Sequence, residues 1–275
     1  MSVHRSTLLV VRKEYRTVFN RDPNQPSQGG QTGRPSPFGF PATSGVGYGG
    51  VAAPATAAVR QGFLRASFTW MFMALIVSAG TALFVFANPQ ALRFVAQNYF
   101  FLAIGAFVVS LVIQMGINRI GTMGAVAGLS IYAVLMGATI GAIVAAYVTF
   151  GGAAAVVSAF LGASAIFGGA ALYGVVTKRD LTKLGGLLFM AFLGLFVVML
   201  VNMFMNSSGL SFVIGIAGVL IFTGLTAYFV QQLNNGGLDY IANRDSAAVV
   251  GALLLYISFI NLFLFLLSLF GGNRD

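Results

Sequence analysis

The sequence contains no cysteine, only one histidine (His4), and six acidic residues among its 275. Without cysteine the chain has no disulfide, thiolate metal site or cysteine nucleophile. With its one histidine near the N-terminus, the hydrophobic body can assemble neither a Ser-His-Asp site nor a histidine-ligated metal site. We therefore expect no catalytic residue, no metal site, no cofactor and no enzymatic activity.

Charge of either sign is also scarce. Charged residues are 8 % of the chain, against about 25 % in ordinary soluble domains. Hydrophobic residues are 58 %, with 26 phenylalanines, and the mean hydropathy is +0.89. A soluble surface cannot be built from so few charges, so the composition predicts an integral membrane protein whose first partner is the lipid bilayer.

After Arg65 the charged residues divide the chain into long uncharged runs of 27, 25, 58, 55 and 28 residues. One crossing needs about 20 residues, so the 58- and 55-residue runs each hold two spans. Breaks at 149–152 and 206–209 separate the members of each pair. The prediction is an all-α bundle of seven transmembrane helices over residues 66–271. The predicted spans are 66–87, 96–117, 122–147, 153–176, 185–206, 210–232 and 247–270.

Basic residues predict the orientation. With the N-terminus inside, thirteen of the fifteen lysines and arginines fall on the cytoplasmic side, and Arg93 and Arg274 fall on the other. Cytoplasmic loops carry such an excess. We therefore expect a cytoplasmic N-terminus and a C-terminus, with its short tail 272–275, on the opposite face.

Residues 1–65 form a predicted basic cytoplasmic tail that holds six of the seven prolines. Within it, residues 22–59 are typical of a linker, because they are too rich in Pro and Gly to fold alone. Residues 6–20 favour a short amphipathic helix. The candidate lipid-binding or docking residues there are Leu8, Val11, Arg12, Tyr15, Arg16 and Val18.

Three interpretations of this tail stay open: a frayed basic segment, an interfacial helix on anionic lipid, or a docking segment for a partner. A fourth is an N-terminal targeting peptide, although Glu14 and the lack of a long apolar core exclude a secretory signal. Nucleic acid is not expected as a partner. The eight basic residues are spread over 65 positions beside a membrane, and attraction to anionic lipid accounts for them more simply.

No charged side chain or histidine falls inside any predicted span, which argues against a proton-driven transporter and against a cation channel. The neutral polar side chains either bridge helices and headgroups or line a cavity. We take Tyr228, Gln231 and Asn261 as the candidate cavity residues. Other neutral polar residues of the spans include Gln114, Tyr132, Tyr173, Asn202, Asn206, Thr226, Tyr256 and Ser258.

Small residues are frequent in the spans 122–147 and 153–176. Gly124, Gly128, Gly137 and Gly141 form two steps of four residues on the first of these spans. Such steps let helix backbones approach closely, so we expect these two spans to be central in the bundle.

Three stretches occur in a recognisable order. Residues 173–185 form a loop signature that contains Lys178, Arg179 and Asp180, and residues 218–228 and 255–263 belong to the last two spans. Together they resemble the Bax inhibitor-1 family over residues 66–271. The resemblance implies a seven-helix bundle with a central last helix and a pH-sensitive Ca²⁺ leak. Family members regulate cell death in eukaryotes, and bacterial relatives associate with membrane proteases.

The family's leak is attributed to two membrane aspartates, one on the sixth helix and one on the seventh. Phe229 and Ser258 stand at these two positions here, and Met136 stands where relatives often carry a polar or acidic residue. Two close carboxylates share a proton, so their charge responds near neutral pH. A phenyl ring and a hydroxyl cannot work in this way.

Two functions follow from the resemblance and the departure. The first is an accessory, scaffold or regulatory subunit of a membrane complex in which the leak is lost. The alternative is an ion leak with a non-carboxylate gate built from Ser258, Asn261, Tyr228 and Gln231. The short loops favour a bacterial inner membrane, with the endoplasmic reticulum and the inner mitochondrial membrane as alternatives.

Overall fold

The computed structural model describes residues 57–236, 238, 241 and 243–271. All regular structure in this part of the chain is helical, which confirms the predicted all-α bundle. The helices are α2 (Ala57–Ala87), α3 (Pro89–Gln97), α4 (Tyr99–Gly151), α5 (Ala153–Val176), α6 (Thr182–Met205), α7 (Ser208–Asn234) and α8 (Arg244–Gly271). The predicted helix at 6–20, its candidate residues and the tail 272–275 lie outside the described residues.

Helix α5 has the bounds of the predicted span 153–176, and α6 and α7 meet at the predicted break near 206. Asn206 has a positive φ of 47° there and ends α6, while the Ser207 side chain accepts the Leu210 N–H and caps α7. The short helix α3 was not expected. Asn88 creates it by accepting the N–H groups of Gln90 and Ala91, at 3.0 and 3.2 Å.

Helix α4 is an antiparallel hairpin of two legs, so its 53 residues cover two predicted spans. The bend is at Gly121, whose φ of 64° suits glycine. Contacts pair the legs symmetrically about it, because Gly128 lies against Ile113 and Gly105 against Leu135. Both legs, 99–120 and 122–151, exceed the about 20 residues of one crossing. Six long apolar helices therefore provide seven crossing segments in the described chain.

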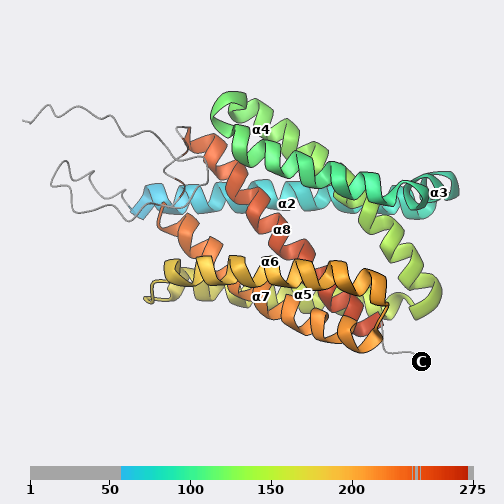
Figure 1. Ribbon diagram of the computed structural model, residues 1–275. Helices are drawn as coiled ribbons and strands as arrows, with labels where there is room; N and C mark the ends of the chain where they lie inside the picture. The colour runs from blue at the N-terminus through green and yellow to red at the C-terminus, as the bar shows by residue number, and fades with distance from the viewer. Residues whose placement is uncertain (1–56, 237, 239–240, 242, 272–275) are drawn as a thin grey trace, which may run out of the picture. The chain divides into compact units, whose positions relative to one another are not determined.

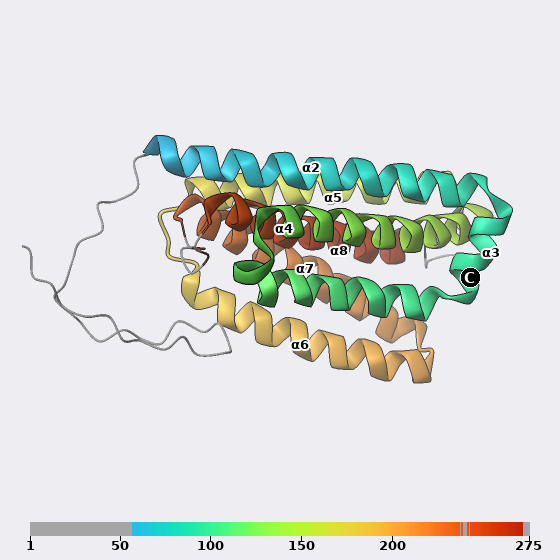
Figure 2. The same ribbon diagram turned by 90° about the horizontal axis from the view of Figure 1, so that it is seen from above.

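These segments alternate in direction (Figures 1 and 2). The start of α2, the Gly121 bend, the α5–α6 loop and the start of α8 lie at one end of the bundle, and α3 and the end of α8 lie at the other. We call the first the basic end. It carries Arg65, Arg119, Lys178, Arg179, Lys183 and Arg244, while Arg93 is on α3 at the opposite end.

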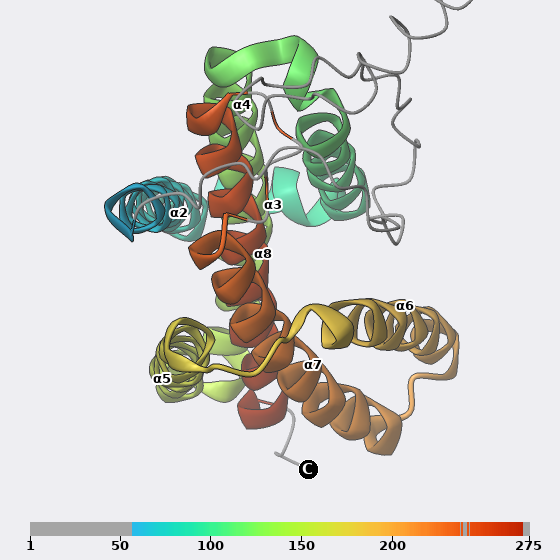
Figure 3. The ribbon, with the colours of Figure 1, turned by 90° about the vertical axis from the view of Figure 1, so that its left-hand side faces the viewer.

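Helix α8 runs through the centre of the bundle, between α2–α4 on one side and α5–α7 on the other (Figure 3). It packs against α2, α4, α5 and α7, and 78 % of its apolar stretch is buried, compared with 22 % for α4 and 33 % for α5. The central helix is thus the last one, as the family resemblance implied, and not the pair of spans that the small residues indicated.

The small residues do allow close packing, but against α2. A Cβ at Gly137 would lie 2.5 Å from the carbonyl oxygen of Ser78, and one at Gly141 would lie 2.7 Å from that of Ala82. These distances leave no room for a side chain, so the second leg of α4 and helix α2 meet backbone to backbone. The sequence rule identified a tight helix pair correctly and its position in the bundle wrongly.

Candidate functional site

Phe229 and Ser258, the two positions to which the resemblance assigns the family's membrane aspartates, lie on α7 and α8. Ser258 is fully buried on α8, and its hydroxyl donates to the carbonyl oxygen of Leu254 on the same helix, at 3.0 Å. Phe229 is half-buried on α7 and packs against the main hydrophobic core. Both side chains are therefore used locally, one as a hydroxyl satisfied by its own backbone and the other as core packing.

Gln231 holds the loop between α5 and α6. Its side-chain oxygen accepts the N–H of Leu181 at 2.8 Å, and its side-chain nitrogen donates to the carbonyl oxygen of Arg179 at 2.7 Å. Both halves of the amide are thus bonded to backbone about fifty residues earlier. The side chain is buried, and its two hydrogen bonds give Gln231 a clamping role.

Tyr228 completes this clamp from a neighbouring turn of α7. Its ring lies over Gly185 of α6, where a Cβ would come within 2.5 Å of the ring. It packs on a small cluster of buried residues formed by Ala170, Leu181 and Ala227. The end of α5, the loop and the start of α6 are consequently fastened to α7 through packing and two hydrogen bonds.

The charged residues of the loop signature point to solvent. Lys178, Arg179 and Asp180 are all exposed. The Thr182 side chain and N–H bond to the Asp180 carboxylate, the N–H at 2.9 Å, and with Lys183 nearby they hold the pKa of Asp180 below its usual range. A carboxylate in the turn before α6 also favours the helix N-terminus, so Asp180 has a structural role in starting that helix.

Asn261, the third candidate cavity residue, donates to the carbonyl oxygen of Ile257 on its own helix at 2.8 Å. Such back-bonding satisfies a side-chain amide within a membrane helix. The polar cavity predicted for Asn261, Tyr228 and Gln231 stays a prediction, and it is distinct from the apolar cleft between α2 and α5, which none of the three lines.

A buried hydroxyl cluster joins α2, α4 and α8. The Ser78 hydroxyl lies 2.9 and 2.8 Å from the carbonyl oxygens of Ala74 and Ala133, and 2.6 Å from the Tyr256 hydroxyl. Ser78 has one hydrogen for two carbonyl acceptors, so Tyr256 donates to Ser78. The Tyr132 ring packs edge-on against Tyr256, with centroids 5.5 Å apart. The sequence singled out both tyrosines as helix bridges or cavity residues but gave no reason to choose Ser78.

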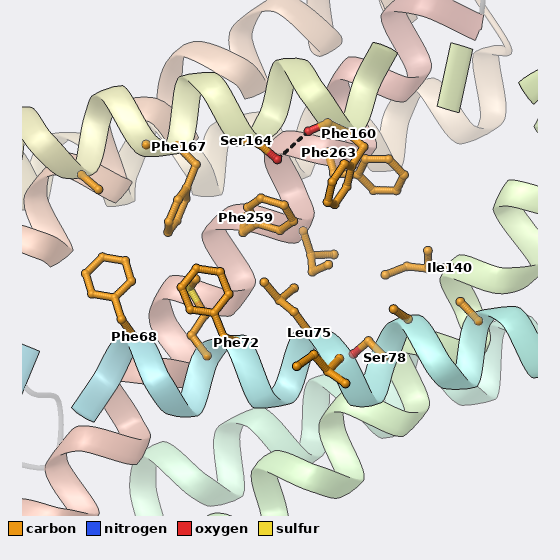
Figure 4. A pocket seen from close by; sticks show the side chains of 17 residues that line it. Phe68, Phe72, Leu75, Ser78, Ile140, Phe160, Ser164, Phe167, Phe259 and Phe263 are labelled. Atoms are coloured by element: carbon orange, nitrogen blue, oxygen red, sulfur yellow. Dashed lines mark hydrogen bonds between the residues drawn. The ribbon is translucent and has the colours of Figure 1, made fainter. Parts of the chain in front are cut away.

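The cleft between α2 and α5 is large and apolar, with α8 as its floor (Figure 4). Its volume is about 580 Å³. Phe259 of α8 forms the floor, and the rings of Phe160 and Phe167 on α5 meet it edge-on at 5.9 and 5.5 Å. The two hydroxyls in its lining, Ser78 and Ser164, are both bonded to backbone carbonyls. The cleft is therefore dry and suited to an apolar occupant.

The described residues offer little acid–base or metal chemistry. No three His, Cys, Asp or Glu side chains come together among them, and each of their buried side-chain nitrogens and oxygens has a hydrogen-bond partner. The long apolar helices, the dry interior and the charged residues gathered at helix ends define the class. This chain is a multi-pass integral membrane protein of the helical-bundle type.

The family follows from comparison with known proteins. The family model described as "Inhibitor of apoptosis-promoting Bax1" matches residues 60–275, so the chain belongs to the Bax inhibitor-1 family. An uncharacterized protein of Deinococcus radiodurans is 38 % identical over 215 residues, which cover 78 % of this chain and 91 % of the relative.

Two further relatives are named as membrane proteins. Inner membrane protein YbhL of Escherichia coli K12 is 34 % identical over 223 residues, covering 78 % of this chain and 93 % of YbhL. An uncharacterized membrane protein of Streptococcus pyogenes is 36 % identical over 178 residues, covering 62 % of this chain and 74 % of the relative. The region that the family model matches contains every described helix except the first residues of α2.

Proposed function

We propose that this protein is a non-enzymatic accessory or scaffold subunit of a membrane complex, and that it has lost the pH-gated Ca²⁺ leak attributed to its family. The observation that carries the proposal is the pair Phe229 and Ser258 at the two gate positions. A phenyl ring has no proton to share and no oxygen ligand to offer a calcium ion. A buried hydroxyl bonded to its own helix does not titrate near neutral pH.

The interior supports the loss of conduction. A calcium ion needs several oxygen ligands, carboxylates among them, and the hydroxyl cluster at Ser78 and Tyr256 brings together two neutral hydroxyls and no carboxylate. Ionisable residues normally mark an ion path through a membrane, and the described spans carry theirs near helix ends. If the protein were instead an ion leak with a neutral gate, the liposome flux experiment would reveal it.

The proposed orientation places the basic end in the cytoplasm. Six of the seven lysines and arginines with described side chains lie at that end, and such an excess is typical of cytoplasmic segments. The relative YbhL is named as an inner membrane protein, which favours a bacterial inner membrane for this chain too. A topology reporter fused after residue 180 should be found in the cytoplasm, and the same reporter fused after Asp275 should be found on the opposite side of the membrane.

The partner of the complex would bind the tail 1–65, almost all of which precedes the family match. The test is to extract the full chain from its own membrane in polymer nanodiscs and to identify polypeptides that copurify. Deleting residues 1–60 should release the partner while leaving α-helical circular dichroism unchanged. A full-length protein that purifies alone, like the deletion, would contradict the accessory role.

Two tail variants separate protein docking from lipid attraction. Replacing Leu8, Val11, Tyr15 and Val18 with serine removes the apolar face but keeps the charge, and this variant should lose the partner. Replacing Arg12 and Arg16 with glutamine keeps the apolar face and weakens attraction to anionic lipid. It should retain the partner. The reverse pattern would assign the tail to the lipid surface.

Restoring the carboxylates tests the loss of the leak. The double variant Phe229→Asp, Ser258→Asp should introduce a Ca²⁺ leak into liposomes that changes between about pH 6 and pH 8, the range of coupled carboxylates. The matched control, Phe229→Asn, Ser258→Asn, has a similar shape without a titrating proton. A leak of equal size in wild type, Asp and Asn variants would show that a neutral gate conducts.

A further inference from the structure

We infer that the cleft between α2 and α5 is a binding site for one acyl chain of an anionic phospholipid, with the lipid headgroup at the basic end. The inference is independent of the accessory role proposed above. It rests on three features of the described residues: the side opening of the cleft, its dry aromatic lining, and the charge gathered at one end of it.

The cleft opens sideways because the backbones of α2 and α5 stay apart, although both helices pack on α8. The rings of Phe68 and Phe167 meet edge-on between the two helices, with centroids 6.4 Å apart. Figure 3 shows the two helices on the same side of α8, and Figure 4 shows the side chains that line the cleft between them. On its rim Phe72 and Phe160 remain 57 % and 51 % exposed. In a bilayer the medium at this rim is hydrocarbon, so the cleft is accessible from lipid.

The dimensions fit one acyl chain. The lining on α2 runs from Phe68 to Ala82, which is about 21 Å at 1.5 Å per residue. The hydrocarbon core of about 30 Å contains two leaflets, so a chain of one leaflet reaches about 15 Å. An acyl chain is much thinner than a helix, which is about 10 Å across, so a cleft of about 580 Å³ suits an acyl chain better than a whole partner helix.

The positive charge at the basic end indicates which class of lipid headgroup binds there. Arg65 is exposed one helical turn before Phe68, which is the first lining residue on α2. Lys178 and Arg179 are exposed just beyond the end of α5, the opposite wall. The acidic group among them, Asp180, is bonded to Thr182. The surplus of positive charge favours a phosphate-bearing anionic headgroup over a zwitterionic one.

Two glycines on α5 provide a matched pair of variants. Gly168 lines the cleft, its neighbour Gly169 does not, and a Cβ added at either position would meet no atom of another segment within 4 Å. Gly168→Leu fills the cleft, and Gly169→Leu places the same side chain elsewhere on the same helix. Ala79→Leu fills the cleft from the α2 wall, and it serves if Gly168→Leu fails to fold.

The experiment reconstitutes the full chain in phosphatidylcholine nanodiscs that contain a trace of phosphatidylglycerol with a photoreactive acyl chain. Mapped crosslinks should concentrate on 68–82 and 160–171 in wild type and in Gly169→Leu, and should fall about tenfold in Gly168→Leu. Arg65→Gln should lower labelling about fivefold, and phosphatidylcholine carrying the same photoreactive chain should label less than phosphatidylglycerol.

Three results would overturn the inference. Labelling in proportion to exposure over α5 and α6 alike would mean that the cleft has no preferred lipid. Equal labelling of the two glycine variants would place the lipid outside the cleft. A polypeptide that crosslinks to residue 168 in native-membrane nanodiscs, and is lost in Gly168→Leu, would make the occupant a partner protein.

Discussion

Helices α6 and α8 are both long, apolar and free of charge along most of their length, yet they occupy opposite environments. In α8, 78 % of the apolar stretch is buried and four other helices contact it, whereas in α6 11 % is buried and α7 is its one contacting helix within the described chain. Lipid is as apolar as leucine, so the hydrophobic effect does not decide which helix is central. Packing shape and hydrogen bonds decide it.

The two sequences differ in how their small and polar residues are used. Gly251 of α8 meets Leu233 and Ser67, and Tyr256 bonds to Ser78 on α2. By contrast, Gly186 and Gly194 of α6 have no atom of another described segment nearby. In α8 small residues allow contact along the helix, whereas in α6 Gly185 at the start is packed under Tyr228 and Gly186 and Gly194 lie on a lipid-facing surface. A glycine in the sequence therefore shows that close helix packing is possible there, but it does not show whether another helix packs against it.

Truncating a leucine should give the largest difference in stability cost between α8 and α6. Leu255→Ala on α8 removes a fully buried side chain and should destabilise the protein by about 2 kcal/mol or more, because the cavity term remains even where lipid replaces water. Leu187→Ala on α6, where the side chain is 66 % exposed, should stay within about 0.5 kcal/mol. Reversible unfolding in mixed micelles measures both. Equal losses would refute the central position of α8.

Next in size is the loss of the clamp that holds the start of α6. Gln231→Ala leaves the N–H of Leu181 without its partner, which should cost about 1–3 kcal/mol locally. Tryptic cleavage after Lys178 and Arg179 should then rise about tenfold. Gln114→Ala, which removes a bond within one helix, is the control and should leave the rate unchanged. An unchanged rate in Gln231→Ala would mean that packing alone holds the loop.

Adding one methyl group to a glycine gives a smaller effect. A Cβ at Gly251 would lie 2.7 Å from Leu233 and 2.8 Å from the Ser67 hydroxyl, so Gly251→Ala should cost about 1–2 kcal/mol. Gly194→Ala on α6 meets open space and should be neutral or slightly stabilising. The same unfolding assay applies, and a neutral Gly251→Ala would show that the neighbours of α8 can move aside for a methyl group.

The smallest effect concerns the hydrogen bond between α8 and α2. Tyr256→Phe removes the donor to Ser78 and should cost about 0.6 kcal/mol, the average for such bonds between membrane helices. Combining it with Ser78→Ala in a double-mutant cycle isolates the pair. Tyr173→Phe, on an exposed tyrosine, is the control. A coupling energy of zero would limit the role of Tyr256 to packing.

Much of the helical layout was predictable because it depends on local properties. Span length follows from bilayer thickness, and the bend at Gly121 and the break at Asn206 fall where charge or polar residues interrupt the apolar runs. The family positions Phe229 and Ser258 could also be found from motifs along the chain. The sequence alone shows that neither position carries a carboxylate.

The remaining features depend on contacts between distant segments. Gln231 bonds to backbone atoms of Arg179 and Leu181, which no side-chain pattern identifies. Ser78 becomes important through its neighbours Ala133 and Tyr256, on two other helices. The cleft between α2 and α5 exists because the backbones of those helices stay apart on α8, and an apolar sequence gives no sign of a gap between apolar surfaces.

The central claim is that the protein conducts no calcium through a titrating gate, and a flux measurement on the unaltered full chain tests it most directly. Proteoliposomes loaded with a Ca²⁺ indicator are stepped between about pH 6 and pH 8, the range in which shared carboxylates titrate. We predict the same slow entry as in protein-free liposomes at every pH. Protein-dependent Ca²⁺ entry that changes across this range would contradict the claim.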